Sequence, residues 1–94
     1  MASNTFLRCR LTKSAFSGER VFRVTAKQIN EYVGVAPLSY CYDETRNQLR
    51  QDQPQNDAIH GHVSAQMISN GDEWAKILVP DGEIIQVPVD LLSY

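Results

Sequence analysis

Residues 58–89 constrain the fold most strongly, because they form three apolar runs separated by two strong turn signals. In the first run, 58–69, one set of alternate positions is apolar or small and the other is polar, which is the period of two typical of a half-buried strand. An Asn-Gly pair follows at 70–71, and both residues tolerate the positive φ angles of a type I′ turn, whose twist matches that of a hairpin. This pattern predicts a strand that enters a tight hairpin.

The two later runs extend this hairpin into a three-stranded meander. Residues 74–79 and 84–89 again alternate between two faces, and the Pro-Asp-Gly sequence at 80–82 turns the chain between them. Pro88 lacks the N–H that a β-ladder needs, so we expect its strand to lie at a sheet edge or to end there. One face of these two runs holds Ala75, Ile77, Val79, Ile85, Val87 and Val89.

Two further strands are expected near the N-terminus. Residues 5–12 and 21–24 alternate apolar and polar positions, and a loop that contains Ser-Gly connects them. A chain of 94 residues has room for one compact core. We therefore predict a single domain, residues 1–94, of mainly β class: a small five- to six-stranded antiparallel barrel with at most one or two short helical turns.

The predicted arrangement resembles the SH3-like barrels, in the broad sense that includes Tudor and KOW modules. Residues 77–92 carry most of the resemblance, because they combine a hairpin with a proline and a single turn that ends in leucines. The resemblance implies a small barrel in architecture and leaves the function open, since one fold serves many functions.

Residues 25–42 allow two interpretations. A Thr and a Gln at capping-box spacing precede apolar residues at helical spacing, which predicts a short two-turn helix ended by Gly34. Alternatively, residues 26–30 form the turn of a hairpin, and 32–35 and 39–42 are strands broken at a proline. The short helix is the interpretation that we prefer from the sequence.

Residues 25–40 also resemble the helix-turn-helix of bacterial repressors, with Gly34-Val35 at the position where that motif turns. They depart from the motif in two places. Asn30 stands where the motif has a small, tightly packed residue before its turn, and Pro37 fits only the first turn of a recognition helix. The β-rich remainder of the chain also lacks the flanking helices of such a domain.

Residues 43–57 form a polar segment inside the predicted domain. Leu49 is the only apolar residue between Tyr42 and Ala58 apart from one proline. Because this composition offers little for a core to hold, we predict a mobile loop here.

Charge is distributed unevenly along the chain, although the formal net charge is only -2. Residues 1–42 carry six basic and two acidic side chains, whereas residues 58–94 carry one lysine and five acidic side chains. The asymmetry predicts either attraction between the two halves or a basic face for an anionic ligand.

No apolar run approaches the roughly 20 residues that span a bilayer, and residues 1–5 lack the charged and apolar regions of a signal peptide. We therefore expect a cytoplasmic protein without a membrane partner. Cys9 and Cys41 lack Cys-x-x-Cys spacing and any motif context, so we predict two reduced, inert core thiols.

His60 and His62 lie on the same face of a predicted strand, a spacing that can hold a metal when neighbouring strands supply further ligands. Two ligands do not make a site, so the preferred interpretation is a pair of solvated surface histidines. We predict no cofactor and no enzyme activity. A small metal-dependent enzyme at these two histidines ranks third among the functional hypotheses.

The predicted binding surface combines an aromatic residue with basic ones. Trp74 beside Lys76 on an outer strand face offers large contact area at low entropy cost, which is typical of a protein-binding surface. Three arginines, Arg8, Arg10 and Arg23, could instead line a groove for nucleic acid. The preferred hypothesis is an interaction module that binds another protein, and a nucleic-acid-binding barrel is the alternative. The partner and the oligomeric state are not predicted.

Overall fold

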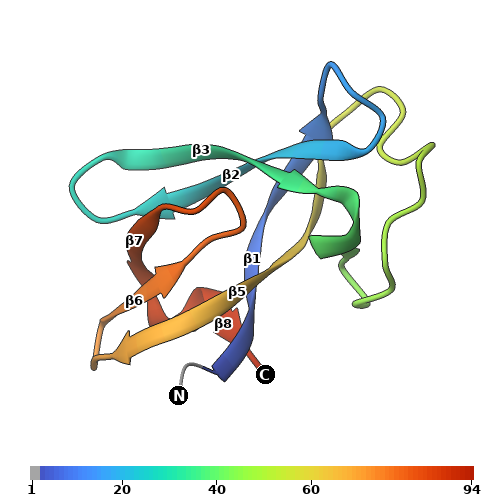
Figure 1. Ribbon diagram of the computed structural model, residues 1–94. Helices are drawn as coiled ribbons and strands as arrows, with labels where there is room; N and C mark the ends of the chain where they lie inside the picture. Colours follow the sequence, from blue (N-terminus) through green and yellow to red (C-terminus); the bar gives the residue numbers. More distant parts are fainter. Residues whose placement is uncertain (1–2) are drawn as a thin grey trace.

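The computed structural model describes residues 3–94 (Figure 1). Met1 and Ala2, which belong to the predicted domain 1–94 and to the segment considered for a signal peptide, lie outside the described residues. The strands are β1 (Ser3–Lys13), β2 (Glu19–Ala26), β3 (Asn30–Pro37), β4 (Cys41–Asp43), β5 (Ile59–Asn70), β6 (Trp74–Leu78), β7 (Ile84–Pro88) and β8 (Leu92–Ser93). Two 3₁₀ turns are η1 (Leu38–Tyr40) and η2 (Val89–Leu91).

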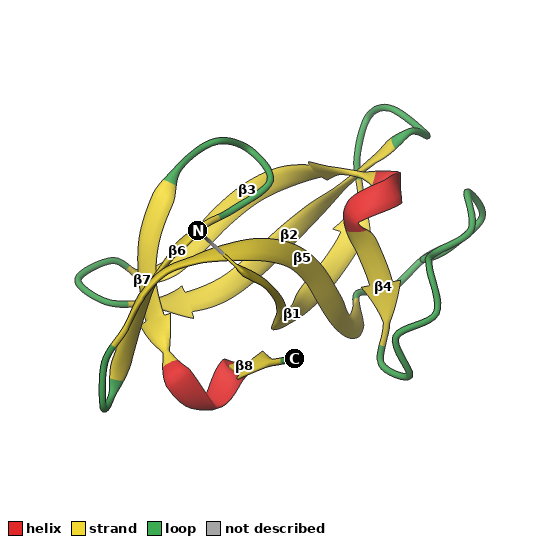
Figure 2. Ribbon diagram, turned by 60° about the horizontal axis from the view of Figure 1, so that its bottom comes forward, coloured by secondary structure: helices red, strands yellow, loops and turns green. Residues whose placement is uncertain are grey.

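The strands form one antiparallel sheet that curls into a half-barrel, with the order β3-β2-β1-β5-β6-β7. β4 pairs with β5, and β8 pairs with β1. Figure 2 shows that the helical segments of the described chain are the two short turns before β4 and β8. The predicted fold class, a small antiparallel barrel of mainly β structure, is confirmed. No helix in residues 3–94 has the length and apolar character required to cross a membrane.

β1 lies at the centre of the barrel and pairs with β5 along one edge. Its other edge changes partners along the strand. Phe6 and Leu7 pair with β8, whereas the segment from Arg10 onward pairs with β2. The N–H of Lys27, in the β2–β3 turn, donates to the carbonyl of Gln86 in β7 at 2.9 Å. β2 and β7 therefore lie close together across the seam where the sheet curls back on itself.

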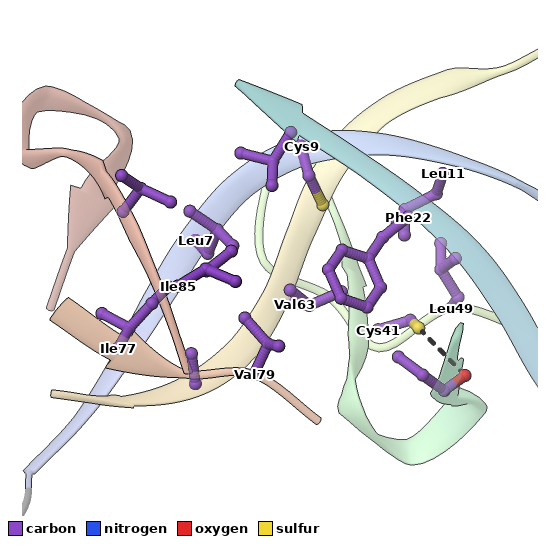
Figure 3. Close-up of a cluster of buried hydrophobic side chains, with 14 residues drawn as sticks. Leu7, Cys9, Leu11, Phe22, Cys41, Leu49, Val63, Ile77, Val79 and Ile85 are labelled. Carbon is purple, nitrogen blue, oxygen red and sulfur yellow. Dashed lines mark hydrogen bonds between the residues drawn. The ribbon is translucent and has the colours of Figure 1, made fainter. Parts of the chain in front are cut away.

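The core has the alternating pattern that the sequence predicts. Ala75, Ile77 and Val79 are buried, as are Ile85 and Val87 on the next strand. β7 ends at Pro88 and is the last strand of the sheet, which confirms the edge position expected of a strand with a proline. Figure 3 shows side chains from the N-terminal and C-terminal strands meeting in one cluster. The fully buried hydrophobic members of the core include Leu7, Leu11, Phe22, Cys41, Val63, Ile77 and Val87.

Residues 25–42 form a hairpin, a 3₁₀ turn and the start of β4, so the predicted short helix is wrong and the hairpin of the alternative interpretation is confirmed. The strand that this alternative places at 39–42 begins only at Cys41, because residues 38–40 form the 3₁₀ turn. β2 and β3 pair over their full length, and Gln28 and Asn30 allow the turn between them by adopting φ values of 76° and 56°. A two-turn helix is marginal on its own in water, whereas the hairpin adds an eight-residue strand to the sheet. The helix-turn-helix resemblance of 25–40 is wrong for the same reason.

The first turn of the meander lies beyond the predicted Asn70-Gly71 position, at Asp72 and Glu73. The N–H of Gly71 donates to the carbonyl of Trp74 at 3.1 Å, and neither Asn70 nor Gly71 has a positive φ. A β-bulge between Met67 and Ser69 shifts the register before the turn. A Cβ on Gly71 would lie 2.5 Å from the Trp74 carbonyl oxygen, so close backbone approach explains this glycine.

Arg20 is the largest fully buried side chain, with 2% of its surface exposed. Burial of a charge is costly unless every donor is satisfied, and here the guanidinium N–H groups donate only to backbone carbonyls. Four of the bonds measure 2.6 to 2.9 Å and the fifth 3.3 Å. The accepting carbonyls belong to Ser17, Glu19, Arg50, Gln51 and Gln53.

The polar segment 43–57 is held to the barrel by these bonds and by Leu49. That leucine is 4% exposed and lies in the same core cluster as Leu11 and Phe22 (Figure 3). Pro54 is also buried. The premise of the predicted mobile loop, that a core cannot hold this segment, is therefore wrong, and mobility itself stays a prediction.

Substitution of Arg20 by leucine tests the buried guanidinium. The five carbonyls lose their donors, so we expect the free energy of unfolding to fall by about 3–5 kcal/mol. Urea unfolding followed by circular dichroism measures this change. Arg23→Leu is the matched control, because its single surface ion pair contributes less than about 1 kcal/mol. Equal effects of the two substitutions would contradict the role of Arg20.

Substitution of Leu49 by alanine tests whether the polar segment belongs to the core. Removal of a buried leucine side chain is expected to cost about 2–4 kcal/mol, again by urea unfolding. Gln55→Ala, at an exposed position of the same segment, should change stability by less than about 0.5 kcal/mol. A loss at Leu49 as small as that at Gln55 would show that this leucine is not part of the core.

Candidate functional site

The three predicted arginines meet on the outer face of the barrel. Arg10 on β1 lies directly opposite Arg23 on β2, and on its other side it lies opposite His60 on β5. Arg8 shares this face because it is two residues from Arg10 on the same strand. Together these four side chains line a shallow cleft of about 380 Å³, where β2 separates from β1. We call it the arginine cleft.

Two glutamates compensate the arginines. Glu31 lies between Arg10 and Arg23, with N···O distances of 3.4 and 3.6 Å. Arg8 pairs with Glu44 at 3.6 Å. All these side chains are substantially exposed, so each pair contributes at most about 1 kcal/mol to stability. None of the ion pairs among the described residues joins residues 1–42 with 58–94, so the predicted attraction between the two halves is not made by direct ion pairs.

A second cleft, of about 480 Å³, lies between the β2–β3 turn and strands β6 and β7. The turn contributes Lys27 and Ile29, β6 contributes Lys76, and β7 contributes Ile84. Trp74 faces the same side of β6 as Lys76, and the Nζ of Lys27 lies 5.7 Å from the centre of its ring. We call these five residues the lysine surface.

The lysine surface combines exposed apolar side chains with uncompensated positive charge. Ile29 is 53% exposed and Ile84 is 55% exposed, which is unusual for two isoleucines that line one cleft. Within residues 3–94, Lys27 and Lys76 take part in no ion pair, in contrast to the arginines of the arginine cleft. This surface can therefore offer both apolar contact and free charge to a partner.

The predicted binding residues thus fall into two separate places. Trp74 and Lys76 are on the lysine surface, and the three arginines are in the arginine cleft. Sequence reasoning missed Lys27, Ile29 and Ile84. Ile84 could have been found, because it lies on the face of its strand opposite the core. Lys27 and Ile29 could not, because the periodicity of the segment that contains them favours a helix.

The two histidines share a strand face but not an environment. His60 is exposed in the arginine cleft, as predicted. His62 is only 9% exposed, and its Nδ1 lies 3.2 Å from the carbonyl oxygen of Asp43. Phe6 packs edge-on against both His62 and Tyr42. The prediction of a solvated His62 is wrong because β4, which carries Tyr42 and Asp43, covers it.

The described residues contain no group of three or more histidine, cysteine or acidic side chains that could hold a metal ion. Cys9 and Cys41 are both buried, which confirms the predicted core thiols. Burial raises the pKa of Cys9 to about 12 and that of Cys41 to about 11, so both remain protonated near neutral pH. A buried thiol in its protonated form is a poor nucleophile.

No protein-family model, no curated protein and no solved structure matches this chain. A functional proposal therefore depends on the side chains described above.

The thiols provide a pH-dependent prediction. Because burial raises their pKa values above the ordinary value of 9.0 for a cysteine, the folded state favours the protonated form. This contribution to stability is complete below pH 9 and is lost as the pH rises toward about 12. We expect urea midpoints to fall across this range, and to fall less in Cys9→Ala.

At pH 8 a thiol reagent such as DTNB should modify both cysteines only in denaturant. Rapid modification of the folded protein would contradict the burial of the thiols.

Proposed function

We propose that this protein is a non-enzymatic interaction module that binds a segment of another protein at its lysine surface. The observation that carries the proposal is the pairing of two half-exposed isoleucines with two lysines that have no ion-pair partner in residues 3–94. Apolar contact surrounded by charge is the usual anatomy of a protein interface. The complementary partner is a segment with apolar side chains flanked by acidic ones.

Each part of the surface has a distinct physical role in this proposal. Ile29 and Ile84 supply apolar area, and removal of such area from water contributes roughly 25 cal/mol per Å² before the costs of association. Trp74 supplies a large side chain with few rotatable bonds, and Lys27 helps to hold its ring. The lysine charges attract acidic groups and raise the association rate.

The arginine cleft favours nucleic acid less than the sequence alone indicates. A phosphate that entered it would meet the carboxylates of Glu31 and Glu44 as well as the guanidinium groups. Binding there would require the arginines to exchange existing partners, which reduces the net electrostatic gain. Nucleic acid is therefore the second candidate, supported by the convergence of Arg8, Arg10 and Arg23 in one cleft.

We further propose an SH3-like architecture for the barrel and a cytoplasmic location. The curled antiparallel sheet and the single 3₁₀ turn between β7 and β8 support the first. Two cysteines that are free and buried support the second, because small domains of oxidising compartments usually use their cysteines in disulfides.

Selection from a random short-peptide library displayed on phage tests the proposed function. We expect enriched sequences that place Leu, Ile or Phe beside Asp or Glu. A labelled synthetic peptide of such a sequence should bind at least about tenfold more weakly to the double variant Lys27→Glu, Lys76→Glu, because attraction becomes repulsion. Fluorescence anisotropy measures the affinity.

Lys13→Glu is the matched control, because Lys13 is an exposed lysine outside both clefts. Its affinity for the peptide should stay within about twofold of the wild type. Amide shifts in NMR spectra should concentrate at residues 27–29, 76 and 84–86. Enriched peptides that shift other surfaces, or that ignore the charge reversal, would contradict the proposal.

A further inference from the structure

β3 is one end of the sheet, and its outer edge has no partner strand among the described residues. The other end strand, β7, differs because the Gln86 carbonyl accepts a hydrogen bond from Lys27 across the seam. Within residues 3–94, β3 pairs only with β2, and it runs along the outside of the half-barrel in Figure 1. An eight-residue strand with one free edge is a template for pairing with another strand.

The free edge presents the backbone groups of alternate residues. In an antiparallel pair, successive residues direct their N–H and C=O groups to opposite edges of the strand. The N–H of Leu38 donates to the carbonyl of Gly18 and continues the β2–β3 ladder, so the even-numbered residues of β3 face β2. Glu31, Val33 and Val35 therefore direct their backbone groups away from the barrel.

A second copy of β3 is the occupant that fits these three positions, because self-pairing about Val33 sets valine against valine and places no two Glu31 carboxylates opposite each other. When two β3 strands pair antiparallel about a twofold axis at Val33, that residue faces its own copy, and Glu31 faces Val35 of the other chain. The Val33 N–H and C=O, the Val35 N–H and the Glu31 C=O then find partners in both copies. Within the described chain only the Glu31 N–H is already engaged, by the Ile29 carbonyl. At the next position, Pro37 has no N–H and limits the pairing.

The side chains at this edge do not oppose such pairing. Val33 is 47% exposed and Val35 is 39% exposed, and Val35 lies opposite Val21 of β2 on the same outer face. Natural edge strands are usually protected by lysines, prolines or bulges. β3 has no lysine, and the carboxylate of Glu31 is held by two arginines of its own chain.

We propose that the free edge of β3 is the interface of a homodimer, in which two half-barrels join their sheets antiparallel about Val33. The valines of both copies form one apolar strip on the outer face of the combined sheet. On the inner face, Tyr32 of one copy lies opposite Gly34 of the other, and Phe22 and Asp81 of each chain already fill the space beside its own Gly34. This proposal uses residues other than those of the lysine surface and is independent of it.

Sedimentation velocity from about 10 μM to about 1 mM tests the dimer, since edge pairing alone buries little area and gives modest affinity. Val33→Pro removes an N–H that faces the free edge and no bond of the β2–β3 ladder, so a folded monomer is expected. Val33→Thr keeps the N–H and should still dimerise. Val35→Lys places a charge on the edge and should also give a monomer if the proline variant does not fold.

The register is tested by NMR on a mixture of labelled and unlabelled wild-type protein. Adjacent Hα atoms of a non-hydrogen-bonded pair are close, so an intermolecular contact between Tyr32 Hα and Gly34 Hα is expected. Three results would overturn the proposal: a monomer at every concentration, a dimer that survives both Val33→Pro and Val35→Lys, or a dimer without this contact.

Discussion

The buried guanidinium of Arg20 connects the two parts of the chain that the sheet alone does not join. One side of it binds the carbonyls of Ser17 and Glu19, where β2 begins, and the other binds carbonyls at residues 50–53. This arrangement holds the long polar segment against the barrel, so that Leu49 can complete the core. An arginine suits this position because its five fixed donors match carbonyls that converge from several directions. A lysine has fewer donors and cannot reproduce the fork.

Much of the fold could be predicted because alternation reports directly on burial in a half-covered sheet. The inward positions of β1, β5, β6 and β7 follow from the sequence since each of these strands has one apolar face. The β2–β3 hairpin was harder to predict. Its residues have helical as well as strand periodicity, and the turn depends on positive φ angles at Gln28 and Asn30 rather than on a glycine. Tertiary pairing decided between two locally acceptable structures.

The candidate site could be predicted only in part, because it depends on contacts between distant residues. Trp74 and Lys76 are adjacent positions on one strand face and were recognisable as a surface. Their neighbours Lys27 and Ile29 reach them only through the hairpin and its bond to Gln86. The ion pairs between the arginines and glutamates could not be predicted either, because Glu31 comes close to Arg10 only through the pairing of three strands. The burial of His62 could not be predicted for the same reason, since it depends on β4.

The proposed function requires that this barrel contact protein through free lysines and exposed isoleucines rather than nucleic acid through its arginines. Fluorescence anisotropy of labelled mixed-sequence oligonucleotides, single- and double-stranded, distinguishes the two when it is measured at low and at moderate salt. Non-specific nucleic-acid binders have dissociation constants of about 10⁻⁴ to 10⁻⁶ M that weaken steeply with salt. We expect no salt-dependent binding in this range. Salt-dependent binding that Arg10→Glu and Arg23→Glu abolish would contradict it and assign the arginine cleft to nucleic acid.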